Sequence, residues 1–281
     1  MALDSDTPYK IDLRIVLVRS LYDRNIGATS RAMTNMGISR LILIAPQCEL
    51  TYSAQQAAAR GQSPLQKALI YKDWDEFFQS EPESLRISFT ARDGRMRNVL
   101  DLEPVFSKII KSQHFKKSQK NPLIIHFIFG PEDCGLSEED LSLTHFSTCI
   151  PTYGENLSLN LSQATLLGMY SFRQFLNSKK NKRTFQFLDY NQIPTKIISP
   201  KSKSKDLKVS QSQKPFPEDT LKDWISELGF DLSQRRMNAL TVLKRILLHS
   251  LPTDKELRVL EAVLQQNIRK LKEWKTLKNL K

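Results

Sequence analysis

The chain has 281 residues, which at roughly 150 residues per domain corresponds to about two domains. Hydrophobic residues make up 40% and charged residues 26% of the chain, values that exclude disorder throughout. The apolar residues come in short blocks, so the sequence predicts no membrane span. The opening stretch, residues 1–10, has no apolar run, and we expect neither a secretory signal nor a transit peptide.

The formal net charge of +12 is unevenly distributed along the chain. Residues 1–176 hold 19 basic and 19 acidic side chains, whereas residues 177–281 hold 23 basic and 11 acidic ones. A localised positive field favours a polyanionic partner, either nucleic acid or an anionic membrane surface. A tail that only solubilises the chain is the alternative. The three cysteines include no CxxC pair, which fits the reducing cytoplasm and argues against a disulfide framework.

The first part of the chain alternates short apolar blocks with amphipathic stretches, a pattern typical of repeated strand–helix units. Near-continuous apolar blocks indicate strands buried on both faces of a parallel sheet. The predicted strands are 15–18, 41–44, 68–71, 86–90, 123–129 and 147–150. The predicted helices are 27–36, 64–68, 73–79, a short one after the capping box at 137–140, and a long one over about 158–176. We therefore predict an α/β domain over residues 1–176.

The remainder of the chain divides into two segments. Residues 177–216 are rich in lysine and serine with few apolar anchors, which predicts a flexible basic linker. Residues 217–281 show helical periodicity and predict helices at 218–228, at 231–249, and from 253 to about 274. The apolar stripe of the last helix consists of Leu257, Leu260, Leu264, Leu271 and Trp274, interrupted by Asn267. We expect this stripe to pack in a small antiparallel bundle rather than in a coiled-coil dimer.

Several common types of site are missing from the sequence. The loop after the first strand holds one glycine, and no GxGxxG or GxxxxGK[ST] motif occurs, which argues against dinucleotide and NTP chemistry and against a Rossmann-type methyltransferase. The histidines show neither HExxH nor HxH spacing, so we expect no metal site. His126 lies in an apolar strand and is expected to be a satisfied core residue.

Three polar clusters remain as candidates. The first runs from Asn25 to Arg31, where a short polar loop leads into a helix and an arginine can hold a phosphate. The second covers 129–136, where a strand end opens into a loop with two glycines and Glu132. The third covers 150–161, where a hydroxyl and an amide precede the long helix. Ordinary N-capping by Asn156 or Ser158 is the structural alternative for this third cluster.

In this order and at these spacings, NIGATSRAM, FGPEDCGLSEEDL and SLNLSQA resemble the three motifs of the SPOUT superfamily, in its SpoU (TrmH-like) branch of RNA ribose 2′-O-methyltransferases. The resemblance covers about residues 12–176. It is closest to the TrmJ-like group, which methylates a ribose in the tRNA anticodon loop, because TARDGR at 90–95 also resembles that group's arginine motif.

The resemblance implies a SPOUT-type parallel sheet with a deep trefoil knot, one of the rare exceptions to un-knotted topology, followed by a small helical C-terminal extension. It implies S-adenosylmethionine as the cofactor, tRNA as the substrate and a homodimer. Ribosomal RNA as the substrate, or a catalytically inactive RNA-binding adaptor, are the alternatives. We expect the basic linker and the helical extension to supply RNA affinity while the knotted domain supplies catalysis.

The resemblance also implies roles for individual residues. The predicted cofactor-binding residues are Phe89, Thr90, Ala91, Gly130, Ile150, Leu157, Ser158 and Leu159. The predicted catalytic residues are Arg31, Asn25, Glu132, Ser158 and Asn160, and the predicted RNA-binding residues are Arg31, Arg92 and Arg95. A guanidinium is a poor general base. We therefore expect Arg31 to hold a phosphate and the developing oxyanion, Glu132 to orient Arg31, and Ser158 and Asn160 to fix the ribose and the cofactor.

The sequence departs from the family pattern at three places. Ser88 and Phe89 replace the usual Gly-Thr before the arginine motif, and Pro131 replaces an arginine in the second motif. The residues before Asn25 are 22–24, Tyr-Asp-Arg, in place of a small residue and a glycine. We expect this last change to affect the RNA target.

Overall fold

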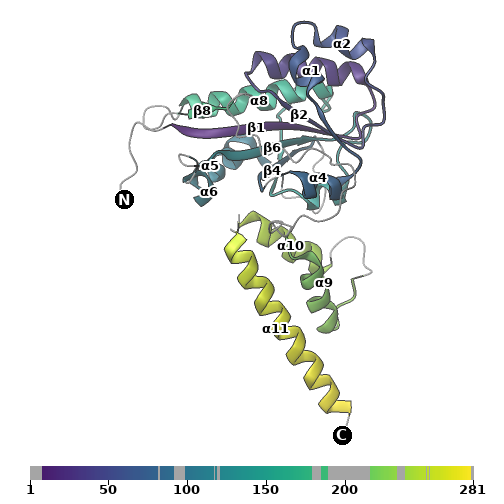
Figure 1. Ribbon diagram of the computed structural model, residues 1–281, viewed down its shortest axis with the longest axis vertical. Coiled ribbons are helices and arrows are strands. Elements are labelled where there is room, and N and C mark those ends of the chain that lie inside the picture. Colours follow the sequence, from purple (N-terminus) through teal and green to yellow (C-terminus); the bar gives the residue numbers. More distant parts are fainter. Residues whose placement is uncertain are drawn as a thin grey trace, which may run out of the picture. The chain divides into compact units, whose positions relative to one another are not determined.

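The computed structural model describes residues 8–81, 83–91, 99–116, 118, 121–178, 185–188, 216–232, 238–250, 252 and 254–279. The chain divides into two compact units, Met1–Lys208 and Val209–Lys281. The first unit is built on a sheet with helices around it, and the described elements of the second unit are helices (Figure 1). Among the described residues, no helix is long and apolar enough to cross a bilayer.

The first unit contains one eight-stranded sheet. Its order is β3-β2-β1-β6-β4-β7-β5, and β8 also pairs with β1. The strands are β1 (Tyr9–Val18), β2 (Arg40–Ile44), β3 (Leu69–Tyr71), β4 (Leu85–Phe89), β5 (Val99–Asp101), β6 (Leu123–Phe129), β7 (Phe146–Cys149) and β8 (Phe185–Phe187). Each of the pairings among the described strands is parallel, and Ile15 of β1 lies opposite Leu41 of β2 and Phe127 of β6. The predicted parallel α/β sheet is therefore confirmed.

Helices cover both faces of this sheet, as Figure 1 shows. They are α1 (Asp23–Asn35), α2 (Tyr52–Ala58), α3 (Gln62–Gln66), α4 (Trp74–Ser80), α5 (Leu102–Lys111), α6 (Gln113–Lys116), α7 (Glu138–Ser142) and α8 (Leu161–Ser178). On one face, the ring of Phe127 lies 5.5 Å from that of Phe172 in α8. On the other face, Ile128 clusters with Phe77 of α4 and Leu141 of α7. Neighbouring strand residues point to opposite faces, which explains why the strand reads as continuously apolar.

Some elements differ from those predicted. β1 begins at Tyr9, well before residue 15, because Asp12 and Arg14 form a buried ion pair and are not surface charges. The helix α2 lacks an apolar periodicity and was not predicted; Thr51 caps it by accepting from the backbone of Ser53. The elements β5, α5 and α6 were also not predicted. β8 lies inside the segment predicted as a linker, most of which lies outside the described residues.

The second unit is a small helical bundle. Its helices are α9 (Glu218–Glu227), α10 (Ala239–His249) and α11 (Asp254–Asn279). Leu264 of α11 is buried against Leu221 and Ile225 of α9, so this part of the stripe packs within the unit, as predicted, whereas Trp274 of the stripe is 59% exposed. Asn267 interrupts that stripe because its Oδ1 accepts a hydrogen bond of 2.8 Å from Trp224 Nε1. Asn238 caps α10, so this helix begins later than residue 231, where its start was predicted, and residues 233–237 lie outside the described residues.

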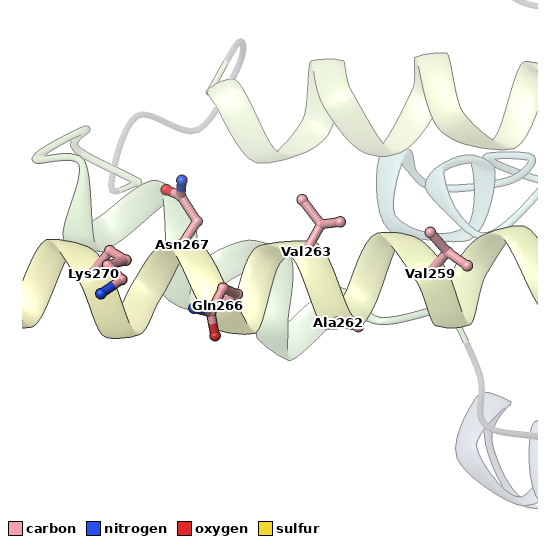
Figure 2. Close-up of a pocket in the computed structure, with 6 residues that line it drawn as sticks. All are labelled: Val259, Ala262, Val263, Gln266, Asn267 and Lys270. Carbon is pink, nitrogen blue, oxygen red and sulfur yellow. The ribbon is translucent and has the colours of Figure 1, made fainter.

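One side of α11 carries a shallow hollow, shown in Figure 2. The residues that line it are Val259, Ala262, Val263, Gln266, Asn267 and Lys270. Val259 and Val263 point to the same side of the helix and are 59% and 60% exposed. Val259 and Val263 thus form an exposed apolar strip on α11, on a different side of the helix from Leu264, which packs on α9. The described residues do not cover this strip.

Candidate active site

A cavity forms where three loops leave the carboxyl ends of adjacent strands. The loops follow β4, β6 and β7, and the strand order places β4 between the other two. Ligands of open parallel sheets bind in this position, outside the carboxyl ends of the strands. The cavity is lined by Phe89, Thr90, Ala91, Phe129, Gly130, Pro131, Glu132, Asp133, Cys134, Gly135, Ile150, Leu157, Ser158, Leu159, Leu161 and Ala164. All eight residues predicted to bind the cofactor are among them.

The loop after β6 is tightly wound at its two glycines. A Cβ atom at Gly130 would lie only 2.3 Å from the backbone nitrogen of Leu136, so only glycine fits there. Gly135 has a φ of +68°, in the left-handed region that favours glycine. The loop then enters α7, where Ser137 and Asp140 form the predicted capping box. The path of this loop along the cavity is therefore fixed by its two glycines.

A chain of hydrogen bonds joins the three sequence motifs beside the cavity. Asn160 donates from Nδ2 to Asn25 Oδ1 over 3.0 Å. Asn25 donates from Nδ2 to Glu132 Oε1 over 2.8 Å. The other carboxylate oxygen of Glu132 accepts from the backbone nitrogen of Leu21 over 2.9 Å. Residues that are far apart in the sequence are thus held in one network at the edge of the cavity.

Both ends of this chain fix its direction. At one end, Asn160 Oδ1 accepts from the backbone nitrogen of Ser162 over 3.0 Å, so the other group of that amide must be a donor. At the other end, the ionised carboxylate of Glu132 can only accept. The side-chain amides of Asn160 and Asn25 each have one consistent orientation. Asn25 therefore has its amide nitrogen as the donor and its amide oxygen as the acceptor in this chain. The geometry is that of a preorganised polar site.

Asn160 also explains where α8 begins. By accepting from Ser162, its side chain caps the helix, which starts at Leu161 rather than at Ser158. The backbone nitrogen of Ser158 donates to Asn156 Oδ1 over 3.0 Å, in a turn before the helix. Both predicted residues of the third motif are exposed, and Ser158 lines the cavity. The capping alternative named Asn156 or Ser158 and is wrong for both, because the capping residue is Asn160, which also contacts Asn25.

Arg31 lies on the exposed side of α1, and the described residues offer it no hydrogen bond or ion pair. The expectation that Glu132 orients Arg31 is wrong, because the Glu132 carboxylate binds Asn25 and the backbone of Leu21 instead. The backbone around Arg31 is fixed by a close approach. A Cβ atom at Gly61 would lie 2.5 Å from Arg31 Cα. The arginine thus projects from a rigid backbone with a free guanidinium group.

Ser30 ties α1 to the loop that contains Gly61. Its buried hydroxyl donates to the Gly61 carbonyl over 2.5 Å and accepts from the Leu65 backbone nitrogen over 2.9 Å. We expect Ser30→Ala to lower the free energy of unfolding by about 1–3 kcal/mol, because both backbone groups lose a buried partner. Urea unfolding measures this loss. Thr34→Ala is the control, because that hydroxyl donates to a carbonyl of its own helix; equal losses for both variants would contradict the expectation.

Other site residues were missed or lie outside the described residues. The lining residues Asp133 and Cys134 follow Glu132 in the second motif, so extending that motif along its loop is the signal that would have found them. Arg92 and Arg95, predicted to bind RNA, lie outside the described residues. Within the described part of the chain, no cluster of three His, Cys, Asp or Glu side chains has the arrangement of a metal site.

Comparisons with known proteins give consistent similarities. The model of the SpoU rRNA Methylase family matches residues 12–170. A Haemophilus influenzae protein named as an uncharacterized tRNA/rRNA methyltransferase is 29% identical over 186 residues, which are 66% of this chain and 72% of that protein. The tRNA (cytidine/uridine/adenosine-2′-O-)-methyltransferase TrmJ of Pseudomonas aeruginosa is 25% identical over 256 residues, covering 90% of this chain and 93% of its own.

A solved structure shares the fold. The crystal structure of TrmJ from Zymomonas mobilis superposes with a TM-score of 0.60 at 24% identity. The match covers 90% of this chain and 97% of that one. It therefore extends beyond the sheet domain.

Proposed function

Because the chain belongs to the SpoU rRNA methylase family, we propose that it transfers a methyl group from S-adenosylmethionine to a ribose 2′-oxygen of tRNA. One observation carries the proposal. The cavity at the carboxyl ends of β4, β6 and β7 adjoins the hydrogen-bonded Asn25, Glu132 and Asn160, with the free guanidinium of Arg31 on the same helix as Asn25. The methyl donor thus has room in the cavity, and the acceptor ribose has room beside it.

The lining of the cavity suits an adenosyl group. The side chains of Phe89, Ile150 and Leu157 provide apolar surface for a planar base, and the Ser158 hydroxyl provides a polar partner. The close winding at Gly130 leaves backbone groups facing the cavity. These residues would hold S-adenosylmethionine, which supplies an electrophilic methyl group on its sulfonium sulfur.

The remaining residues are proposed to act on the ribose. Asn25 and Asn160 have fixed donors and acceptors that would orient the sugar hydroxyls next to the cavity. Arg31 would bind a backbone phosphate and stabilise the 2′-oxygen as it loses its proton. Glu132 acts through Asn25, which makes it a positioning residue in this proposal. Holding both reactants in line contributes a large part of the rate in such transfers.

Two relatives support tRNA as the substrate. The proteins from Pseudomonas aeruginosa and Yersinia enterocolitica named TrmJ act on tRNA by their names, and both matches cover 90% of this chain. The excess of positive charge in residues 177–281 supplies a surface attracted to phosphates. We propose that Arg92 and Arg95 add RNA contacts. The family description names rRNA, which is the second candidate substrate.

We further propose a homodimer in the cytoplasm, with the knot that the family resemblance implies. The outer side of α8 exposes Leu166, Leu167 and Tyr170, which have 36%, 38% and 49% of their surface accessible. Consecutive turns of one helix bring these three apolar side chains together, and a second copy of the chain would cover them. The three cysteines, Cys48, Cys134 and Cys149, include no CxxC pair, which supports a reducing compartment.

The test is transfer of tritiated methyl groups from S-adenosylmethionine to total tRNA and total rRNA, followed by alkaline hydrolysis. We expect label in tRNA, in dinucleotides that resist alkali because the methylated 2′-oxygen cannot attack the phosphate. Label in rRNA alone would replace tRNA by the second candidate. If titration calorimetry with S-adenosylmethionine gives no heat and no RNA is labelled, the chain is an RNA-binding adaptor and the proposal is wrong.

A further inference from the structure

Two tyrosine side chains are exposed beside the candidate active site. Tyr22 immediately precedes α1 and is 60% exposed, and Tyr52 opens α2 and is 70% exposed. Neither ring has a hydrogen bond or ring contact with the described residues. Both rings are therefore available to a partner molecule.

The backbone of Tyr22 is attached directly to the site. Its carbonyl accepts from the backbone nitrogen of Asn25 over 3.0 Å. The preceding residue, Leu21, donates its backbone nitrogen to Glu132. Tyr22 is thus flanked on both sides by groups of the hydrogen-bond chain that borders the cavity. Its ring starts from a fixed point on the rim of the site.

Tyr52 is brought to the same rim by its neighbour. The Asp23 carboxylate accepts hydrogen bonds from the Thr51 hydroxyl and, over 3.3 Å, from the Thr51 backbone nitrogen. Tyr22 and Tyr52 each adjoin one partner of this contact. The helices α1 and α2 also approach each other closely, because a Cβ atom at Gly27 would lie 2.0 Å from the Ala54 carbonyl oxygen. Two immobile backbone segments therefore present the two rings.

The charges around the tyrosines fit a polyanion. Arg24 and Arg31 are seven residues apart on α1, so they share one side of the helix, and both are exposed. The acidic neighbours are Asp23 and Glu132, and both carboxylates accept hydrogen bonds from the protein. The two guanidinium groups thus remain available to a ligand, whereas these two carboxylates are engaged in hydrogen bonds within the protein. This balance favours a polyanion such as RNA over an apolar partner.

We propose that Tyr22 and Tyr52 form a base-stacking subsite for unpaired nucleotides that flank the methylated ribose. The inference rests on the proposed function and adds two residues that would contact the RNA bases next to the reacting ribose. Bases in loops are unstacked and free to lie on aromatic rings, whereas bases in a helix are not. Stacking tolerates any base, so the subsite would select loops by shape more than by sequence.

The experiment uses the full-length chain and a fluorescent RNA hairpin with a seven-nucleotide loop, in which each loop base is removed in turn to leave an abasic site. We expect Tyr22→Ala and Tyr52→Ala each to weaken binding of the intact hairpin about 10- to 100-fold. The Tyr→Phe variants keep the ring and should recover affinity to within about twofold, because stacking needs no hydroxyl. Gln56→Ala, an exposed residue one turn further along α2, is the matched control and should bind as the wild type does.

The abasic hairpins identify the contact. For one or two loop positions, loss of the base should weaken binding to the wild type but leave binding to the alanine variants unchanged, because the stacking partner is already gone. Equal losses in wild type and variants at every position would overturn the inference. So would alanine variants that change the oligomeric state measured by light scattering and leave RNA affinity intact, since the tyrosines would then contact a second copy.

Failure of the proposed function has a different signature. In that case the wild type transfers no methyl group to any RNA, and calorimetry with S-adenosylmethionine gives no heat. If the wild type methylates tRNA and the alanine variants bind the hairpin normally, only the stacking inference is wrong. If the proposed function and the stacking inference are both correct, the KM for RNA should rise in the alanine variants while the affinity for S-adenosylmethionine stays constant.

Discussion

Replacing Arg31 with lysine should lower kcat for RNA methylation by about 100-fold or more, as loss of one oxyanion-stabilising group does in other enzymes. Lysine keeps the positive charge but loses the planar fork that binds a phosphate in a bidentate way. The Arg31 side chain is exposed and the described residues give it no partner, so its loss removes no contact within the fold. The affinity for S-adenosylmethionine and the unfolding midpoint should both remain at wild-type values.

The comparison variants separate the two parts of this effect. Arg31→Ala loses both the positive charge and the planar guanidinium group. We expect its kcat to be no more than about tenfold below that of Arg31→Lys. Arg60→Lys makes the same change on an exposed arginine next to Gly61 and should retain wild-type activity. Single-turnover kinetics with labelled tRNA measure the rate of transfer. If Arg31→Lys stays within a few-fold of wild type, bidentate geometry is irrelevant and the role proposed for Arg31 is wrong.

Much of the fold could be predicted because the strands are buried on both faces. The strand Leu123–Phe129 has the predicted bounds, since every residue in it except His126 is apolar. The start of β1 was missed because the charged residues Asp12 and Arg14 interrupt its apolar run, and a sequence does not reveal that two charges are buried together. The helix α2 was missed because its buried positions are alanines, Ala54 and Ala58, which give a weak apolar signal.

The residues of the candidate site could be predicted from the three motifs, but their contacts could not. Asn25 and Glu132 are brought together as expected for one site. Their pairing with each other, and not with Arg31, depends on where the loop after β6 turns at Gly130 and Gly135. That geometry is set by tertiary packing, so no spacing along the chain encodes it. The same holds for Tyr22 and Tyr52, which are brought near each other by the contact of Asp23 with Thr51 and by the packing of α1 on α2.

A second large effect is expected far from the cavity, in a buried ionic cluster around Arg14. The guanidinium of Arg14 binds Asp12 Oδ2 over 2.6 Å and also binds Glu81. Glu81 accepts a further hydrogen bond of 2.8 Å from the Tyr71 hydroxyl, and its Oε2 lies 3.4 Å from His126 Nε2. His126 itself is fully buried and contacts Ser84 through Nδ1, which agrees with the core role predicted for it.

We expect Arg14→Met to lower the free energy of unfolding by about 3–5 kcal/mol at pH 7, because it leaves the buried Glu81 without its arginine and Asp12 with only Arg40, whose Nε lies 4.0 Å away. Lys10→Met removes a positive charge from the same strand, where the side chain is only half-buried and unpaired with described residues, and should cost less than about 0.5 kcal/mol. Denaturant unfolding measures both. A loss below about 1 kcal/mol for Arg14→Met would show that the cluster is not what stabilises this end of the sheet.

The pH dependence tests the same cluster independently. Burial would raise the pKa of Glu81, but hydrogen bonding with His126 and the charge of Arg14 outweigh it and lower the pKa from 4.5 to about 2. A lowered pKa in the folded state contributes stability that is present above pH 4.5 and is lost as the pH falls through 2. Burial lowers the pKa of His126 below 6.5, so its protonation also favours the unfolded chain in acid.

Wild-type stability should therefore fall as the pH is lowered from 7 to 3. The difference between wild type and Arg14→Met should shrink over the same range, because without the arginine Glu81 takes up a proton more readily in the folded state and its unpaired charge disappears. Glu81→Gln combined with Arg14→Met should likewise recover part of the stability that Arg14→Met alone loses. A difference that stays constant from pH 7 to pH 3 would mean that the cost comes from lost packing of the arginine side chain and not from the stranded carboxylates.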